Sequence, residues 1–171
     1  MNEPTLYIMC GLPFSGKTVL AQKLSDRFGF PIVGIDNIKE ERGFSWEENE
    51  KVTAEVWKSI FDESYKRTLA YLQTSTSVIY DSANQDRTSR DRLRKLAQSG
   101  NLDSKVILVD VPEDEIRKRW LKNQETKERF HLPEKYLQAA IDAFEKPTPD
   151  ENVLTYNQSA DLETWMASGF H

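Results

Sequence analysis

The sequence predicts an α/β protein in which a parallel β-sheet lies between two layers of helices, and two observations support this. Residues 11–18 read Gly-Leu-Pro-Phe-Ser-Gly-Lys-Thr, which fits the phosphate-binding loop pattern G-x-x-x-x-G-K-[ST] at every fixed position. In addition, short apolar runs alternate along the chain with segments whose apolar residues recur at helical spacing. This alternation is typical of a three-layer α/β sandwich with five strands.

The phosphate-binding loop has the flanking segments that it needs. Residues 5–10 form an apolar run typical of a buried strand, and residues 19–28 have helical periodicity. In such a loop the glycines let backbone amides surround phosphates, the lysine reaches the β- and γ-phosphates, and the final hydroxyl binds Mg²⁺. We therefore expect ATP and Mg²⁺ as cofactors. The residues expected to bind the nucleotide are Gly11, Pro13, Phe14, Ser15, Gly16, Lys17, Thr18 and Val19.

The composition limits the classes of function. The 171 residues are 38% apolar and 30% charged, with a net charge of −5, which fits one soluble domain over residues 1–171 and argues against a general nucleic-acid or membrane surface. The single cysteine, Cys10, excludes an intramolecular disulfide and fits a core position in a reducing compartment. No leader or membrane-length apolar run is evident, so we expect a cytoplasmic protein.

Two predicted strands end on a carboxylate. The second apolar run, residues 31–36, ends on Asp36, and the third, residues 78–81, ends on Asp81. Because ligands bind at the carboxyl edge of parallel sheets, we expect Asp36 and the phosphate-binding loop to face one crevice. An alternative and compatible role for Asp36 is to cap the helix that follows.

Two long helices are predicted in the middle of the chain. The capping-box pattern of Ser45 and Glu48 predicts a helix that begins there and runs to about Leu72. Residues 86–98 predict a second helix, rich in arginine, with most of its charges in solvent. The face of the first helix expected in the core consists of Val52, Val56, Trp57, Ile60, Phe61, Tyr65 and Leu69.

The last part of the chain predicts a lid. A fourth strand, residues 105–111, precedes a helix that begins at Pro112 and becomes basic. Residues 123–129 have no apolar face, so we expect a mobile, short helical lid over about residues 119–132. Further elements are expected at Pro133 (a helix with Tyr136, Leu137, Ala140, Ile141 and Phe144 inward), at residues 153–156 (a strand) and at residues 162–166 (a helix). His131 and His171 lack metal-ligand spacing.

Three further segments resemble a known family. Residues 35–39, Ile-Asp-Asn-Ile-Lys, are similar to the family's D-[DE]-x-[RK] segment. Residues 81–84, Asp-Ser-Ala-Asn, with Arg90 six residues later, and residues 144–147, Phe-Glu-Lys-Pro, add weaker similarity. With the phosphate-binding loop, they make nearly the whole chain resemble the small P-loop kinases, which include the kinase domain of phage polynucleotide kinase, the zeta toxins and chloramphenicol phosphotransferase.

The resemblance implies a sheet order of 2-3-1-4-5 and a role for each matching residue. It implies that Asp36 is the general base on the acceptor hydroxyl and that Asp81 holds the Mg²⁺ shell together with Thr18. The residues it implies for acceptor binding are Asp36, Lys39, Asn84 and Arg90. The implied lid would supply Arg119 or Arg129 to the γ-phosphate.

This sequence departs from the family pattern at three positions. Asn37 replaces the second acid, Lys39 replaces an arginine and so loses the bidentate fork, and Asn123 replaces the second lid arginine. The loss of this fork argues against an acceptor that itself carries a phosphate. The identity of the lid cation that contacts the γ-phosphate stays open.

The sequence thus predicts an ATP-dependent kinase that transfers the γ-phosphate to a hydroxyl of a metabolite, nucleoside or antibiotic. The expected catalytic residues are Lys17, Asp36, Arg119 and Arg129. One alternative is a 5′-hydroxyl polynucleotide kinase, which ranks lower because the chain is acidic and the basic helix lacks aromatic residues for stacking bases. Another is a nucleotide-binding switch or regulatory ATPase, which would need neither Asp36 nor a basic lid.

Overall fold

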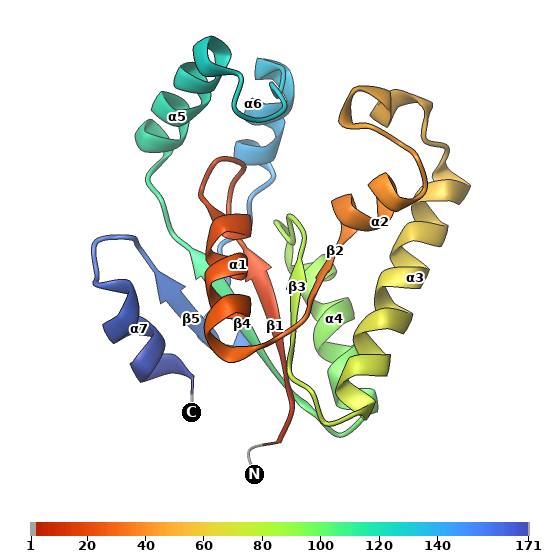
Figure 1. Cartoon of the computed structure of the whole chain (residues 1–171). Helices are drawn as coiled ribbons and strands as arrows, with labels where there is room; N and C mark the ends of the chain where they lie inside the picture. Colours follow the sequence, from red (N-terminus) through yellow and green to blue (C-terminus); the bar gives the residue numbers. More distant parts are fainter. Residues whose placement is uncertain (1–2, 171) are drawn as a thin grey trace.

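The structure, a computed structural model, describes residues 3–170 but not the side chains of residues 46 and 47. Its parallel sheet has the order β2-β3-β1-β4-β5, as the family resemblance implied (Figure 1). The strands are β1 (Thr5–Cys10), β2 (Ile32–Gly34), β3 (Val78–Asp81), β4 (Asp103–Val109) and β5 (Val153–Tyr156). His171, considered above as a metal ligand, lies outside the described residues.

Helices cover both faces of the sheet (Figure 1). They are α1 (Lys17–Phe28), α2 (Ile35–Glu41), α3 (Ala54–Gln73), α4 (Arg87–Ser99), α5 (Glu113–Thr126), α6 (Glu134–Asp142) and α7 (Leu162–Gly169), with short 3₁₀ helices η1 (Trp46–Lys51) and η2 (Pro149–Glu151). Between residues 3 and 170, none of them is long and apolar enough to span a bilayer.

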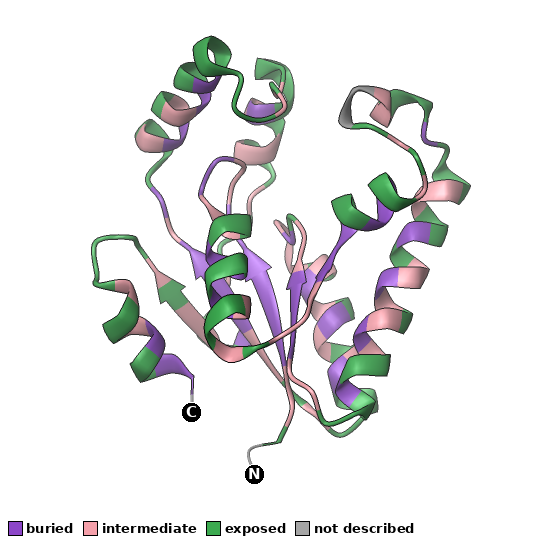
Figure 2. Cartoon of the chain, in the orientation of Figure 1, coloured by how far each residue is buried: buried purple, intermediate pink, exposed green. Residues whose placement is uncertain are grey.

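The central strand β1 is buried on both faces, so its alternating side chains contribute to two separate cores (Figure 2). Leu6, Ile8 and Cys10 pack with α3 and α4, whereas Tyr7 and Met9 pack with α1 and α7. Cys10 is fully buried, as expected for a core residue, and burial raises the pKa of its thiol to about 11.

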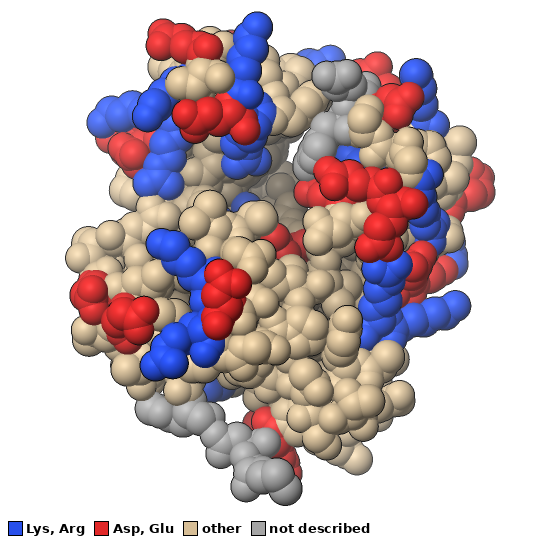
Figure 3. Space-filling view, viewed as in Figure 1, with Lys and Arg blue, Asp and Glu red and all other residues tan. Residues whose placement is uncertain are grey.

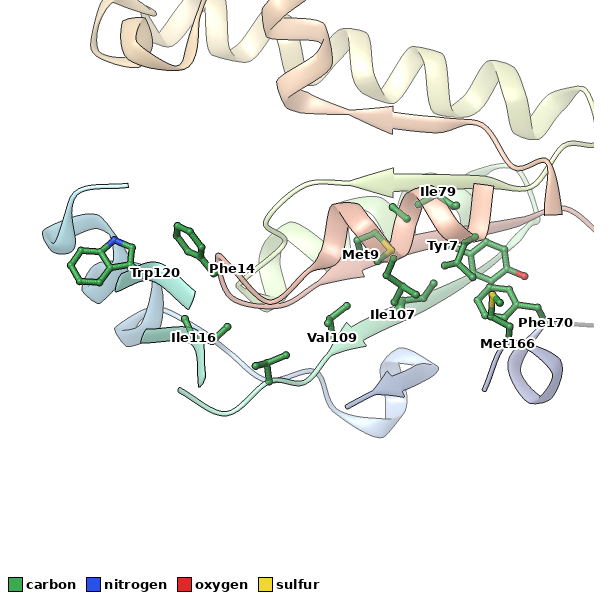
Figure 4. Packing of buried hydrophobic residues seen from close by; sticks show 14 of the residues in the cluster. Tyr7, Met9, Phe14, Ile79, Ile107, Val109, Ile116, Trp120, Met166 and Phe170 are labelled. Atoms are coloured by element: carbon green, nitrogen blue, oxygen red, sulfur yellow. The ribbon is translucent and has the colours of Figure 1, made fainter. Parts of the chain in front are cut away.

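The second of these cores continues from the sheet into the phosphate-binding loop and the lid (Figure 4). Phe14 of the loop and Trp120 of α5 are each only 6% exposed and belong to the same cluster as Met9, Ile107 and Val109. The hydrophobic effect therefore fixes the loop against both the sheet and α5.

The helix predicted from residue 45 is two elements. The capping box of Ser45 and Glu48 forms, but it caps the short helix η1. The helix α3 begins at Ala54, where the Thr53 hydroxyl accepts a hydrogen bond from the Val56 amide at 3.3 Å. A capping box stabilises a first turn of either helix type, so the pattern did not distinguish the two.

The buried face of α3 also differs from the prediction. The fully buried row contains Ile60, Ser64, Thr68 and Leu72. In the aromatic row, Trp57 and Tyr65 are partly buried and pack against the core, whereas Phe61 is exposed. The Ser64 hydroxyl shares a 2.8 Å hydrogen bond with the hydroxyl of Tyr80 on β3, which satisfies both buried polar groups. A polar partner on the sheet thus draws Ser64 to the centre of the buried face. The expectation that Trp57 and Tyr65 contribute to the core is confirmed, and the same expectation for Phe61 was wrong.

The lid residues are more ordered in secondary structure than predicted. The helix α5 continues to Thr126, so most of the expected polar flap is helical, and Asn123 within it is buried. In α6 only Leu137 is fully buried; Tyr136, expected to face inward, is 44% exposed and its hydroxyl donates to Glu50 of η1 at 3.5 Å. The α5–α6 lid therefore reaches across to η1.

One arginine of α4 is not on a solvated face. Arg90 is 1% exposed, and its guanidinium donates two hydrogen bonds to the buried Glu151 carboxylate, at 2.7 and 3.1 Å. It also donates to the Asn84 carbonyl at 3.1 Å. This ion pair fastens α4 to η2 beneath the loop after β3.

We expect Glu151→Ala to lower the free energy of unfolding by about 3–5 kcal/mol, because it leaves the Arg90 guanidinium buried without its counter-charge. Urea unfolding monitored by circular dichroism measures this loss. The matched control is Asp150→Ala, which removes the neighbouring carboxylate from an exposed pair with Arg87 and should have a much smaller effect. Equal effects of the two substitutions would contradict this role for the buried pair.

Candidate active site

The phosphate-binding loop joins β1 to α1 at the carboxyl edge of the sheet. Gly11 has a φ of +151°, and a Cβ there would lie 2.8 Å from the Val109 carbonyl oxygen and 2.9 Å from the Ser15 Oγ, so only glycine fits. The Lys17 ammonium donates to the carbonyls of Gly11 and Leu12 at 2.8 and 2.9 Å. Burial lowers the pKa of Lys17 to about 8, opposed by the charge of Asp81.

The loop fits a chain of phosphates. The Ser15 side chain is fully buried, and its hydroxyl has no hydrogen-bond partner among the described residues. An orphaned hydroxyl in a glycine-bounded loop, beside the positive end of α1, is a suitable donor for an anionic oxygen.

Thr18 and Asp81 offer oxygen atoms next to that loop. The Thr18 hydroxyl, in the first turn of α1, donates a hydrogen bond to the Asp81 carboxylate at the end of β3. Burial raises the pKa of Asp81, while this hydrogen bond and the Lys17 charge act in the opposite direction. Hydroxyl and carboxylate oxygens together suit Mg²⁺. In the described part of the chain, no group of three His, Cys, Asp or Glu side chains could hold a metal ion.

Asp36 lies in the first turn of α2 and does not cap it. The strand β2 ends two residues earlier than predicted, at Gly34, which is the N-cap residue and makes no side-chain cap. The capping alternative is therefore wrong, and the Asp36 side chain is exposed at the carboxyl edge of the sheet. Although the residue is exposed, desolvation by the surrounding protein raises the pKa of the Asp36 carboxyl to about 6. The charge of Lys39 opposes this shift, those of Asp81 and Glu40 add to it, and that of Arg129 opposes it.

Arg129 faces this acid from the lid. Its guanidinium carbon lies 4.3 Å from the ring centroid of Phe14, and burial lowers its pKa while Asp36 opposes that shift. The buried Asn123 side chain donates to the Arg129 carbonyl at 3.0 Å and accepts from the Arg129 amide at 3.1 Å. Asn123 thus fixes the backbone that presents Arg129, a role that the sequence pattern did not reveal.

Arg119 contacts the opposite side of the loop. Its guanidinium donates to the carbonyls of Phe14 and Ser15 at 3.2 and 3.3 Å and to Gln158 Oε1 at 2.7 Å. Gln158 also donates to the Ser15 carbonyl at 2.8 Å. Gln158 follows β5 in a segment without any motif, so only the tertiary structure identifies it.

A pocket of about 330 Å³ opens beside Arg119 and Gln158. Its other lining residues are Gly16, Val19, Leu20, Lys23, Tyr156 and Leu162. Arg119 and the largely apolar walls suit a flat ring at one end of the phosphate-binding loop. A larger pocket of about 650 Å³ lies at the amino edge of the sheet, around Thr5 and Lys105, on the wrong side for the loop chemistry.

Three residues implied for the acceptor are engaged within the protein. The fully buried Lys39 donates to the Asn49 side chain at 2.6 Å and lies close enough to Asp36 to lower its pKa. The buried Asn84 donates to the Met9 carbonyl at 2.8 Å, and Arg90 pairs with Glu151 as described above. Electrostatic interactions connect Lys17, Asp36, Asp81 and Arg129. These four form one cluster. The surface is hollowed between the part that contains the lid and the part that contains α2 (Figure 3).

Comparison with known proteins identifies the family of the chain. A family model described as an AAA domain matches residues 6–147, most of the chain. The chain belongs to this family. No curated protein matches this AAA domain in sequence.

Solved structures show that its fold is that of the small P-loop kinases. A sugar kinase from Janibacter sp. is 20% identical over 96% of this chain and 91% of its own, with a TM-score of 0.70. A gluconokinase from Sinorhizobium meliloti is 17% identical over 99% and 91%, with a TM-score of 0.66. Kti12 from Chaetomium thermophilum, solved with ADP-AlF3, is 18% identical over 96% and 95%, with a TM-score of 0.72.

Proposed function

We propose that this AAA domain is an ATP-dependent kinase that transfers the γ-phosphate to a hydroxyl group of a small molecule. The observation that carries the proposal is the position of Asp36, an exposed carboxylate that caps no helix and interacts electrostatically with Lys17 and Arg129. A carboxylate placed beside a phosphate-binding loop can accept the proton of an attacking hydroxyl. A nucleotide switch has no use for such a base.

Each part of the site then has a role. The loop amides and Lys17 bind the β- and γ-phosphates, and the base of ATP lies in the pocket beside Arg119. Thr18 and Asp81 would hold Mg²⁺, which neutralises charge on those phosphates. Asp36 orients the acceptor hydroxyl and takes its proton. Sugar and gluconate kinases among the structures with this fold support a small-molecule acceptor.

The test is ADP release from Mg²⁺-ATP in the presence of nucleosides, sugars, gluconate, antibiotics and oligonucleotides with 5′-hydroxyl ends. The kinase proposal expects release to rise strongly with at least one small alcohol, whose phosphorylated product mass spectrometry detects. Release that is the same without any acceptor would favour the regulatory ATPase. Stimulation by oligonucleotide ends alone would favour the polynucleotide kinase.

The two lid arginines should have separate roles. We expect Arg129→Ala to lower turnover about a hundred- to a thousandfold with little change in the KM for ATP, because charge on the transferred phosphoryl group develops in the transition state. Arg119→Ala should instead raise the KM for ATP about tenfold and change turnover little, since Arg119 contacts the loop and lines the pocket proposed for the nucleobase of ATP. Steady-state kinetics of both variants measure this split, and the reverse pattern would overturn the assignment.

A further inference from the structure

Phe14 is a large aromatic residue at a backbone position that favours glycine. Its φ is +64°, in the left-handed region that residues with a side chain rarely adopt. It is nevertheless only 6% exposed, and its ring belongs to the same core cluster as Trp120 of α5. Figure 4 shows both rings at the same end of this cluster. A strained loop backbone thus carries a ring to the boundary with the lid, where glycine would provide none.

The Phe14 ring contacts the guanidinium of Arg129, whose central carbon lies 4.3 Å from the ring centroid. A cation over an aromatic face is attracted by the ring quadrupole, and a planar guanidinium can stack there without using its N–H groups. All the hydrogen bonds that Arg129 makes with the described residues involve its backbone, which binds the Asn123 side chain. The N–H groups of the guanidinium are therefore available to an anionic oxygen.

The guanidinium of Arg119, the other lid arginine, is engaged within the protein through all three nitrogens. Nε donates to Glu115 at 3.0 Å, and the other two donate to the carbonyls of Phe14 and Ser15 and to Gln158. A phosphate that bound Arg119 would have to replace these contacts, each of which satisfies a polar group of the protein. Arg129 is therefore the lid arginine that can bind a phosphate without such a loss.

Arg129 is also held close to a second cation of the loop. Burial is the main cause of the lowered pKa of Lys17, and the charge of Arg129 lowers it further. Two cations at this range repel each other, and an anionic oxygen between them relieves the repulsion. Because the lysine of a phosphate-binding loop reaches the β- and γ-phosphates, the anion that suits both cations is the terminal phosphate.

We propose, on the basis of the kinase function above, that Phe14 is a positioning residue whose ring holds the Arg129 guanidinium over the phosphate-binding loop for the transferred phosphoryl group. Asn123 fixes the backbone of Arg129, and Phe14 fixes the charged end of its side chain. A long side chain that is held at both ends loses little further conformational entropy when the phosphate binds. The cation is thus preorganised for charge that develops in the transition state.

The kinetic test compares Phe14→Leu with Arg129→Ala and with the double variant. Leucine has the same backbone constraint as phenylalanine and keeps an apolar side chain, but it has no ring face. We expect Phe14→Leu to lower turnover about tenfold with the KM for ATP within about twofold, and the double variant to be no slower than Arg129→Ala. Ile116→Val is the control, because it removes a methyl group from the same core cluster and should leave turnover within about twofold. Unchanged turnover in Phe14→Leu, or multiplied losses in the double variant, would overturn the positioning role.

An NMR measurement separates this proposal from the kinase function, because it needs no acceptor. The Nε–H signal of Arg129 is assigned by its loss in Arg129→Ala. In the parent and in Ile116→Val, we expect the Phe14 ring current to shift this signal upfield. We also expect Mg²⁺ with a non-hydrolysable ATP analogue to move it more than Mg²⁺-ADP does. In Phe14→Leu the upfield shift should be lost and the response to the analogue reduced.

This NMR pattern supports the positioning role even if no tested alcohol is phosphorylated, a result that would count against the kinase function alone. Two outcomes in the parent overturn the proposal whether or not Phe14→Leu folds: an Arg129 signal without the upfield shift, and equal responses to ADP and to the ATP analogue. A response to the analogue that is as large in folded Phe14→Leu as in the parent overturns it as well.

Discussion

Replacing Lys17 with alanine should lower phosphoryl transfer by at least about a thousandfold, because it removes the fixed positive charge between the β- and γ-phosphates. In this structure the Lys17 ammonium is held by the carbonyls of Gly11 and Leu12, so its position is defined by the loop itself. Single-turnover transfer to the acceptor found by the ADP-release panel measures the loss. Affinity for ATP should fall as well, since the charge also binds the ground state.

Two controls restrict the interpretation of the Lys17 result. Lys66→Ala removes an exposed lysine of α3 far along the chain from the loop and should leave transfer unchanged. Circular dichroism melting of Lys17→Ala should show a folded protein that Mg²⁺ and a non-hydrolysable ATP analogue stabilise less than they stabilise the parent. Near-normal transfer by the folded Lys17→Ala protein would remove the basis for placing the phosphates on this loop.

The parts of the fold that the sequence predicted well depend on local signals. The bounds of β1 and β3 match the predicted runs because each is a short, continuous apolar segment that becomes buried on both faces. The loop from Gly11 to Thr18 is equally local, since its glycines, lysine and hydroxyl act through the backbone of one segment.

The α3 region shows which information hydrophobic periodicity does not contain. Which of two adjacent helix rows enters the core depends on the partner surface, and here the Tyr80 hydroxyl on β3 selects the row with Ser64. Trp57 is only partly buried, although it packs against the core, and Phe61 is exposed. Hydrophobicity along the helix therefore predicted the amphipathic element correctly but did not reveal the polar residues Ser64 and Thr68 in its buried face.

The residues of the site also divide into those that a local sequence signal predicted and those that only the tertiary structure reveals. Asp36 and Asp81 were found from strand ends, because parallel topology brings those ends to one edge. Arg90 has the charge of a ligand-binding residue, but its burial and its carboxylate partner Glu151, 61 positions later, give it a structural role. Gln158 contacts the loop from 143 positions away, and no sequence pattern marks contacts of that range.

Replacing Asp36 with asparagine should lower turnover about a hundred- to ten-thousandfold, because the amide cannot take the proton of the acceptor hydroxyl. The KM for ATP should hardly change, since the loop and the pocket beside Arg119 are untouched. Steady-state kinetics with the acceptor from the panel measure both quantities. Near-normal transfer by a folded Asp36→Asn protein would end the general-base proposal.

The pH dependence distinguishes a base from a merely polar contact. In the parent, kcat/KM for ATP at saturating acceptor should rise with pH through about 6 as Asp36 ionises, and fall above about 8 as Lys17 loses its proton. Asp36→Asn should lose the acidic limb and keep the alkaline one. A parent profile that is flat between pH 5 and 7 would contradict the assignment of Asp36.

The contribution of Asp36 to folding stability should change with pH in the opposite sense to its contribution to activity. The folded protein raises the pKa of Asp36 above its ordinary value of 3.8, so the folded state binds this proton more tightly than the unfolded chain does. Ionised Asp36 therefore destabilises the fold, fully so above about pH 6, and protonation relieves the cost as the pH falls towards 4. Asp36→Asn removes this cost, so its melting temperature relative to the parent should be higher at pH 8 than at pH 5. We therefore expect Asp36→Asn to be less active than the parent and, relative to the parent, more stable at pH 8 than at pH 5, as for a catalytic carboxylate that costs folding free energy. Equal differences in melting temperature at the two pH values would mean that Asp36 is solvated and contributes no such cost.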